Sequence, residues 1–211
     1  TGYGRKHFAE ADLVKTEINC AAAAVSLLYP GTKNIIDIGG EDIKVIRCDE
    51  QGNVANFYMN DKCAAGTGAF LNEIAERAEI NSAEMSSLAS ISDYDKELNS
   101  FCTVFAKTEI MNWIFDGMPA HDIARGIYIS IANKVSKMRI ESGLPVYLIG
   151  GVIKHHPYLQ VMLSEKFKMN IEVVEHPQFV VSYGAAIMAR QFYNALPEEV
   201  ETVLQSHDQH K

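Results

Sequence analysis

The sequence predicts an α/β fold, and three features lead to this prediction. Three short apolar segments separated by turns occupy residues 33–59, a pattern typical of antiparallel strands. Helix-like apolar stretches then alternate with two further short strands. Two of the strands end in a pair of glycines. Strands followed by alternating helices and strands indicate an α/β architecture.

The first part of the chain is expected to form one helix and a three-stranded meander. The helix covers INCAAAAVSLL (18–28), and Pro30 and Gly31 end it because proline cannot continue a helix. KNIIDIGG is typical of a buried strand, EDIKVIRC alternates between polar and apolar residues, and DEQGN is a turn before VANFYM. The strands are therefore expected at residues 33–40, 41–48 and 54–59.

The second part of the chain is expected to alternate between helices and strands. Apolar periodicity predicts helices at about 69–80, 104–115, 120–141, 156–168 and 183–195, and strands at 145–151 and 171–175. The tail LPEEVETVLQSHDQHK (196–211) is expected to form a short, frayed helix.

Length and composition restrict the class of protein. With 211 residues, the chain is long enough for one large domain or two small lobes. A net charge of −8 argues against a nucleic-acid surface, which requires clustered lysine and arginine. No secretory signal and no run of about 18 apolar residues are visible, so no membrane partner is expected. The four cysteines contain no CxxC pair, which argues against a zinc ribbon or a thioredoxin-type motif. They are also too sparse for a disulfide scaffold, so a reducing cytoplasm is the expected location.

The motif DIGGED suggests a phosphate site. Gly39 and Gly40 allow the backbone to turn tightly and to approach a ligand, and Asp37 and Asp42 flank them. Backbone N–H groups beside a carboxylate suit a phosphate that carries a magnesium ion. A plain glycine turn with a solvated aspartate is the simpler interpretation of this motif alone.

A second glycine pair repeats the pattern in LIGGVIKHHPYL. Gly150 and Gly151 follow a buried strand and precede a helix, a junction that can hold a nucleotide near a helix N-terminus. One such pair is most often an ordinary turn, but two in one α/β chain favour a nucleotide cleft. The chain has no GxxxxGK[ST] motif, which excludes a P-loop protein.

Two of the cysteines precede predicted helices. Cys63 lies before AAGTG and a helix, and Cys102 lies before TVFAKTEIM. The partial positive charge of a helix N-terminus stabilises a thiolate. Packing of a small side chain at a crowded helix start explains each cysteine equally well. Cys20 and Cys48 are expected to be core or surface thiols without a chemical role.

Six stretches together resemble a known family: TGYGR, IDIGGEDIKVI, MNDKCAAGTGAFL, CTVFAKTEI, GGV and YGAA. The family is that of the ATP-dependent activators (component A) of 2-hydroxyacyl-CoA dehydratases, grouped with the ATPase subunits of benzoyl-CoA reductase. The stretches occur in family order over most of the chain, and NDKCAAGTG is highly specific.

The resemblance implies the actin-like, sugar-kinase-like ATPase fold, with two ribonuclease H-like lobes around a nucleotide cleft. DIGGED corresponds to the second phosphate loop, and Gly150 and Gly151 to the adenosine loop. The family's first phosphate loop would lie upstream of Thr1, so the chain is expected to be a fragment with an incomplete N-terminal lobe. The expected parts are a remnant of that lobe (1–31), a C-terminal lobe with the nucleotide and iron–sulfur loops (32–182), and a C-terminal helix and tail (183–211).

The resemblance also implies cofactors and partners. Cys63 and Cys102 match the cysteines that bind a 4Fe–4S cluster shared by the two subunits of a homodimer. ATP or ADP and Mg²⁺ would bind in the cleft. ATP hydrolysis would drive low-potential electrons from a donor such as ferredoxin or flavodoxin to a 2-hydroxyacyl-CoA dehydratase or a related reductase.

Specific roles follow for the matching residues. Asp37 and Asp42 would position magnesium and water, and Glu17 would orient the attacking water. Glu41 would lie next to the nucleotide in the second phosphate loop. The backbone would also approach the nucleotide at five glycines: Gly39, Gly40, Gly150, Gly151 and Gly184.

Three departures from the family pattern leave alternatives open. Glu41 stands where glutamine is usual, Lys107 and Thr108 replace an acidic residue and serine, and Ala69 stands where arginine is usual. These changes, with the upstream loop outside the chain, fit a non-enzymatic or divergent dimerising module of a larger activator. A small-molecule kinase on the same fold is a weaker alternative, because a kinase has no use for Cys63 and Cys102.

Overall fold

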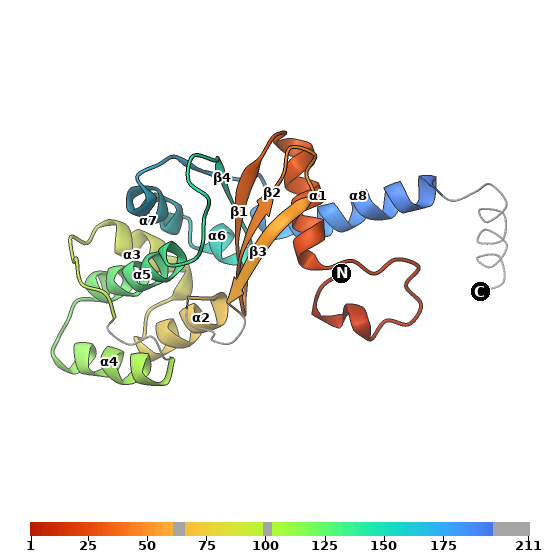
Figure 1. Cartoon of the computed structure of the whole chain (residues 1–211). Helices are drawn as coiled ribbons and strands as arrows, with labels where there is room; N and C mark the ends of the chain where they lie inside the picture. The colour runs from red at the N-terminus through yellow and green to blue at the C-terminus, as the bar shows by residue number, and fades with distance from the viewer. Residues whose placement is uncertain (61–65, 99–102, 196–211) are drawn as a thin grey trace.

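A five-stranded sheet separates two groups of helices (Figure 1). The computed structural model describes residues 1–60, 66–98 and 103–195. The predicted ligands Cys63 and Cys102 and the predicted tail helix (196–211) lie outside the described residues.

The sheet has the strand order β3-β2-β1-β4-β5. The first three strands form an antiparallel meander, as predicted, whereas β4 runs parallel to β1 and β5 runs parallel to β4. The strand bounds are β1 (Lys33–Ile38), β2 (Ile43–Cys48), β3 (Val54–Asn60), β4 (Val146–Ile149) and β5 (Ile171–Val173).

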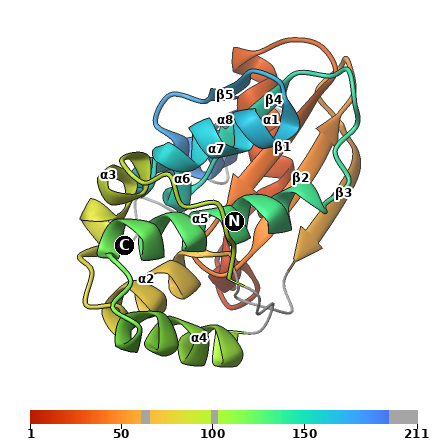
Figure 2. The same ribbon diagram turned by 90° about the vertical axis from the view of Figure 1, so that its left-hand side faces the viewer.

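Helices cover both faces of the sheet, and for this reason every residue of β1 is buried. On one face Ile36 and Ile38 belong to the larger core cluster, which includes residues of six helices. Figure 2 looks toward this group of helices, with the sheet behind most of them. They are α2 (Gly68–Arg77), α3 (Met85–Ser90), α4 (Thr103–Phe115), α5 (Ala120–Ser136), α6 (Gly151–His155) and α7 (Tyr158–Phe167).

The opposite face carries the helices α1 (Glu17–Leu28) and α8 (Val180–Asn194). Ile35 and Ile46, which are directly opposite each other in the ladder, form the smaller core cluster with residues of these helices. The α1 helix begins at a capped N-terminus, because the hydroxyl of Thr16 accepts a hydrogen bond from the backbone N–H of Asn19 at 3.2 Å. Three short 3₁₀ helices complete the described elements: Tyr3–Lys6, Ser82–Glu84 and Pro177–Phe179.

The helices differ from the prediction in three respects. The helix expected at 156–168 is present as α7, but the short α6 before it was not predicted, and Pro157 separates the two because its nitrogen cannot donate an intrahelical hydrogen bond. The helix expected to reach residue 141 ends at Ser136. The α3 helix was not predicted, since its six residues include three serines and show no clear apolar period. Among the described helices, none has the length and apolar character needed to span a membrane.

Candidate functional site

An open cleft of about 1530 Å³ lies where the β1–β2 turn, the start of α2, α3 and the α6–α7 segment meet. Gly40, Glu41 and Gly151 line it together. The two glycine pairs that were singled out in the sequence therefore lie at one cavity, although Gly40 and Gly150 are 110 positions apart in the chain. Parallel pairing of β1 with β4 brings the ends of these strands side by side.

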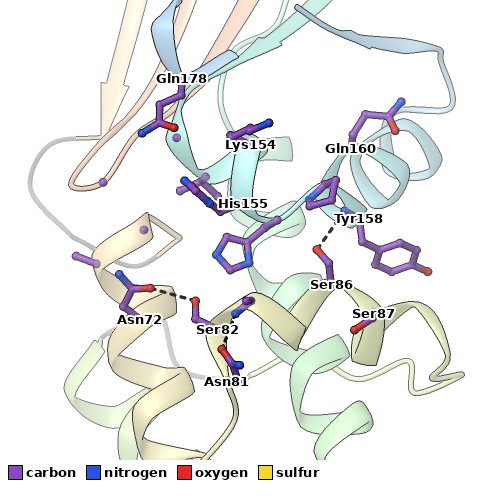
Figure 3. A pocket seen from close by; sticks show the side chains of 18 of the residues that line it. Asn72, Asn81, Ser82, Ser86, Ser87, Lys154, His155, Tyr158, Gln160 and Gln178 are labelled. Carbon is purple, nitrogen blue, oxygen red and sulfur yellow. Dashed lines mark hydrogen bonds between the residues drawn. The ribbon is translucent and has the colours of Figure 1, made fainter. Parts of the chain in front are cut away.

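Polar side chains from both sides of the cleft point into the region drawn in Figure 3. On one side, the hydroxyl of Ser82 donates a hydrogen bond to the amide oxygen of Asn72 at 3.1 Å. Across the cleft, the backbone N–H of Tyr158 donates to the hydroxyl of Ser86 at 3.3 Å, which connects α7 to α3. The cleft thus offers many hydrogen-bonding groups to a ligand.

Gly150 allows the closest contact between β1 and β4. Its φ of 107° lies in a region that disfavours side chains, and a Cβ atom there would lie 2.3 Å from the carbonyl oxygen of Ile38. The same Cβ would lie 2.6 Å from a carboxylate oxygen of Asp37. A glycine is therefore required for the end of β4 to reach this carboxylate.

The start of α2 is bound directly to the β1–β2 turn. The backbone N–H of Gly68 donates to the carbonyl oxygen of Gly39 at 3.0 Å, and that of Ala69 donates to Gly40 at 2.7 Å. A Cβ atom on Gly68 would lie only 3.3 Å from the Cα of Gly40. Two hydrogen bonds and close packing therefore connect this turn to the helix that follows the Cys63 loop in the sequence.

Three carboxylates surround one buried ammonium group next to the β1–β2 turn. The Nζ of Lys44 lies 3.1 Å from an oxygen of Glu17 and 3.8 Å from one of Asp37, and it donates a hydrogen bond to Asp42. We call these four residues the Lys44 cluster. When all are ionised, three negative charges and one positive charge leave the cluster with a net charge of −2.

Burial and charge act in opposite directions on the pKa of Asp37. Burial raises this pKa to about 6, and the carboxylates of Asp42 and Glu17 add to the increase, against the opposing effect of Lys44. Burial lowers the pKa of Lys44, but its three acidic neighbours outweigh this effect and raise it. Asp37 is therefore mostly ionised above pH 7, and Lys44 remains charged.

The Lys44 cluster has the ligand type that Mg²⁺ prefers, since the ion usually binds one or two carboxylates together with phosphate oxygens and water. Asp37 and Asp42 fit this role in kind, with Asp42 partly exposed and the end of β4 beside Asp37. Within the described ranges, no group of three His, Cys, Asp or Glu residues is arranged to hold a metal ion by itself. Any Mg²⁺ bound here would need ligands from the nucleotide.

The described residues that flank positions 61–65 and 99–102 bear on the predicted iron site. The α4 helix begins at Thr103, directly after Cys102, and α2 begins five positions after Cys63. The two helices contact each other, and an ion pair joins Lys107 of α4 to Glu73 of α2. Thiolates are the ligands that 4Fe–4S clusters use, so the donor type fits.

The two remaining cysteines are core residues, as predicted. Cys20 and Cys48 are both free and fully buried. Gly184 lies on α8 against α1, where a Cβ atom would be 1.8 Å from the carbonyl oxygen of Cys20. This glycine does not line the cleft, and the structure gives it a role in helix packing, so a contact with nucleotide stays a prediction.

Sequence reasoning missed two sets of residues. Lys44 was not among the predicted site residues, although pairing of Asp37 with Lys44 follows from a hairpin closed at GGED. His156 was not among the predicted site residues either. Of the two adjacent histidines, His155 is exposed and His156 is buried.

His156 is part of a buried hydrogen-bond chain at the cleft. Its Nδ1 lies 2.7 Å from the hydroxyl of Tyr128, which in turn lies 3.2 Å from the hydroxyl of Ser86. Burial, with a smaller effect from His155, lowers the pKa of His156 to about 4, and burial raises that of Tyr128. The imidazole is therefore neutral at physiological pH.

A loss of stability in acid is expected from His156. Because its pKa is about 4 in the folded protein and near 6.5 when unfolded, the unfolded state binds more protons between these values. The free energy of unfolding should therefore fall by up to about 3 kcal/mol as pH decreases from 6.5 to 4. Urea unfolding should show that the free energy of unfolding of His156→Gln decreases less between pH 6.5 and pH 4 than that of the unchanged protein. The exposed His7, replaced by Gln, serves as control, and equal pH dependence of all three proteins would contradict the expectation.

Comparison with known proteins gives consistent matches. Residues 1–189 match the BadF/BadG/BcrA/BcrD ATPase family. The chain is 37% identical over 207 residues to the 2-hydroxyisocaproyl-CoA dehydratase activator of Clostridioides difficile, covering 96% of this chain and 77% of the relative. It is 36% identical over 192 residues to the (R)-2-hydroxyglutaryl-CoA dehydratase activating ATPase of Acidaminococcus fermentans, covering 90% and 73%.

A solved structure shows the same fold. It is an activator of the 2-hydroxyisocaproyl-CoA dehydratase from Clostridium difficile with bound ADPNP, with a TM-score of 0.81 and 33% identity. The match covers 99% of this chain and 75% of that chain. The predicted α/β, actin-like ATPase fold is thereby confirmed.

Proposed function

The chain belongs to the BadF/BadG/BcrA/BcrD ATPase family, and from this premise we propose that it couples ATP hydrolysis to low-potential electron transfer. The acceptor would be a 2-hydroxyacyl-CoA dehydratase or a related acyl-CoA reductase. Relatives named as activators of such dehydratases, and one named as a benzoyl-CoA reductase subunit, support this kind of partner.

The observation that carries the proposal is the meeting of the two glycine loops at one cleft beside buried Asp37. ATP would bind there, with its phosphates toward the β1–β2 turn and the backbone N–H groups around Gly40. Asp37 and Asp42 would hold Mg²⁺ and its water molecules. Glu17, which meets Lys44 on the same face of the sheet as Asp37, would orient the attacking water. The ADPNP bound to the similar activator supports a nucleotide in this family's cleft.

The connection between the β1–β2 turn and α2 offers a route from hydrolysis to the iron site. A change at the turn when the γ-phosphate leaves would act on the backbone N–H groups of Gly68 and Ala69. The α2 helix would move with the turn, because interatomic contacts at Gly68 leave little free space. The ion pair between Glu73 and Lys107 would carry the movement to α4.

Cys63 and Cys102 would bind the iron–sulfur centre. When bound, a 4Fe–4S cluster supplies a one-electron carrier whose potential responds to nearby charge and solvent. Each chain offers two thiolates, so two copies would complete the four ligands and form a homodimer. The electron donor would be a small redox protein such as a ferredoxin or flavodoxin, and the reducing cytoplasm stays the expected location.

Loss of either proposed ligand should abolish cluster binding. Cys63→Ser in the full-length protein, purified without oxygen, is expected to retain less than about a tenth of the iron of the unchanged protein, because serine is a poor ligand for the cluster. Iron and sulfide assays together with the visible absorption spectrum measure this result. Cys48→Ser, at a cysteine buried on β2, is the matched control and should retain its iron. Unchanged iron content in Cys63→Ser would exclude the ligand assignment.

A second candidate function is a non-enzymatic dimerising module without productive ATP turnover. Glu41 lines the cleft, and its negative charge would repel phosphate oxygens. Phosphate release by the full-length protein separates the two functions. ATP hydrolysis by the unchanged protein would exclude the non-enzymatic module. Hydrolysis that appears only after the Glu41→Gln substitution would favour it.

A further inference from the structure

Lys44 is a buried lysine that connects three separate elements through their carboxylates. Its side chain is 6% exposed, and its partners come from the first turn of α1 (Glu17), the end of β1 (Asp37) and the β1–β2 turn (Asp42). Asp37 is its direct neighbour across the antiparallel ladder. Burial of a lysine is unfavourable unless its charge is paired, and here three oxygens pair with it.

A second buried lysine on the same face of the sheet has different surroundings. Lys33 is fully buried near the opposite end of β1 and lies opposite Cys48 in the ladder. Its Nζ donates a hydrogen bond to the hydroxyl of Ser26 on α1 at 3.2 Å. No carboxylate lies within 4 Å of it among the described salt bridges. Both lysines therefore contact α1, but only Lys44 contacts an acidic group.

We propose that the ammonium group of Lys44 is a tethered monovalent cation and acts as the positioning residue that holds the carboxylates of Glu17 and Asp37 together at the end of β1. Three carboxylates this close together would repel one another without a positive charge. A covalently attached ammonium keeps them together without the need to bind a free ion. The effect on the fold rests on these contacts alone, whereas the effect on hydrolysis rests on the function proposed above.

The first experiment measures the fold and requires no nucleotide. Lys44→Ala in the full-length protein should lower the thermal midpoint by roughly 10 °C, because removal of the ammonium group leaves buried Asp37 and two partly exposed carboxylates without a positive partner. Propylammonium, which replaces the lost side chain and its charge, should restore at least about half of this loss with a saturable dependence on concentration. 1-Propanol, which has a similar size but no charge, should not restore the thermal midpoint. Sodium chloride keeps the ionic strength equal in the two measurements.

Lys33→Ala is the matched control for a buried lysine. Its thermal midpoint should respond equally to propylammonium and 1-propanol, because its lysine has a hydroxyl partner and no acidic one within ion-pair distance. If Lys44→Ala does not fold, the double variant with Asp42→Asn removes one unpaired charge and takes its place in the same assay. Equal effects of the amine and the alcohol on the Lys44 variants would overturn the proposal.

The second experiment measures hydrolysis and nucleotide binding. Lys44→Ala should lose phosphate release by about tenfold or more, and propylammonium should restore it selectively, with little change in affinity for a fluorescent ADP analogue. Two results together would refute the ATPase function and leave the tethered cation intact: the amine restores the thermal midpoint of Lys44→Ala, and the unchanged protein releases no phosphate from ATP. Normal hydrolysis in Lys44→Ala would refute the positioning role.

Discussion

Replacing Gly184 with alanine is expected to lower the free energy of unfolding by at least about 4 kcal/mol or to prevent folding. The added Cβ would lie 1.8 Å from the carbonyl oxygen of Cys20 and 2.5 Å from its carbonyl carbon. These are backbone atoms of α1, so rotation of a side chain cannot relieve the overlap. The two helices would have to separate, and the core cluster between them and the sheet would open.

Soluble yield and the thermal midpoint measure this result. Gly151→Ala is the control, because a Cβ atom there has no heavy atom within 4 Å. This variant should keep its stability within about 0.5 kcal/mol, and it should bind nucleotide more weakly because the methyl group enters the cleft. A Gly184→Ala protein as stable as the unchanged chain would show that α1 and α8 do not pack as described.

Replacing Asp37 with asparagine is expected to reduce ATP hydrolysis by about 10² to 10³-fold. The amide has nearly the shape of the carboxylate but lacks the charge that would hold Mg²⁺ and orient its water. The free energy of unfolding should change by less than about 1.5 kcal/mol, because the lost ion pair with Lys44 is offset by the removal of a buried charge. Activity and stability should therefore respond separately.

Phosphate release at saturating MgATP and pH 7.5 measures the effect, together with the thermal midpoint. Asp116→Asn, at an exposed aspartate after α4, is the control and should leave both unchanged. Hydrolysis by Asp37→Asn within about threefold of the unchanged protein would remove Asp37 from the proposed mechanism.

Local patterns in the sequence predicted the elements around the cleft well. The meander followed from alternating apolar residues and short turns, and DIGGED placed Asp37 and two glycines at the end of a buried strand. These signals lie within a few neighbouring residues, where backbone preferences decide the conformation. The approach of Gly150 to Asp37 depended instead on parallel pairing of distant strands, and the repeated glycine pair was the only sign of it.

Features that depend on contacts between distant residues were missed. The packing of α1 against α8 at Gly184 was not foreseen, and it accounts for the small size of this residue, whereas the predicted contact with nucleotide stays a prediction. Lys44 was not recognised as the centre of a charged cluster, since Glu17 reaches it from another layer of the fold. The buried chain from His156 to Ser86 likewise joins three helical segments that no local pattern relates.

The contact between the β1–β2 turn and α2 uses main-chain donors and acceptors alone. Exchange of the side chain at position 69 therefore leaves both hydrogen bonds available. Replacing the side chains of neighbouring non-glycine residues with alanine would not reveal the connection, because it would leave every participating atom in place. Only a change to the polypeptide backbone itself, such as an ester in place of the amide of Ala69, would delete one of these bonds and leave the surrounding side chains intact.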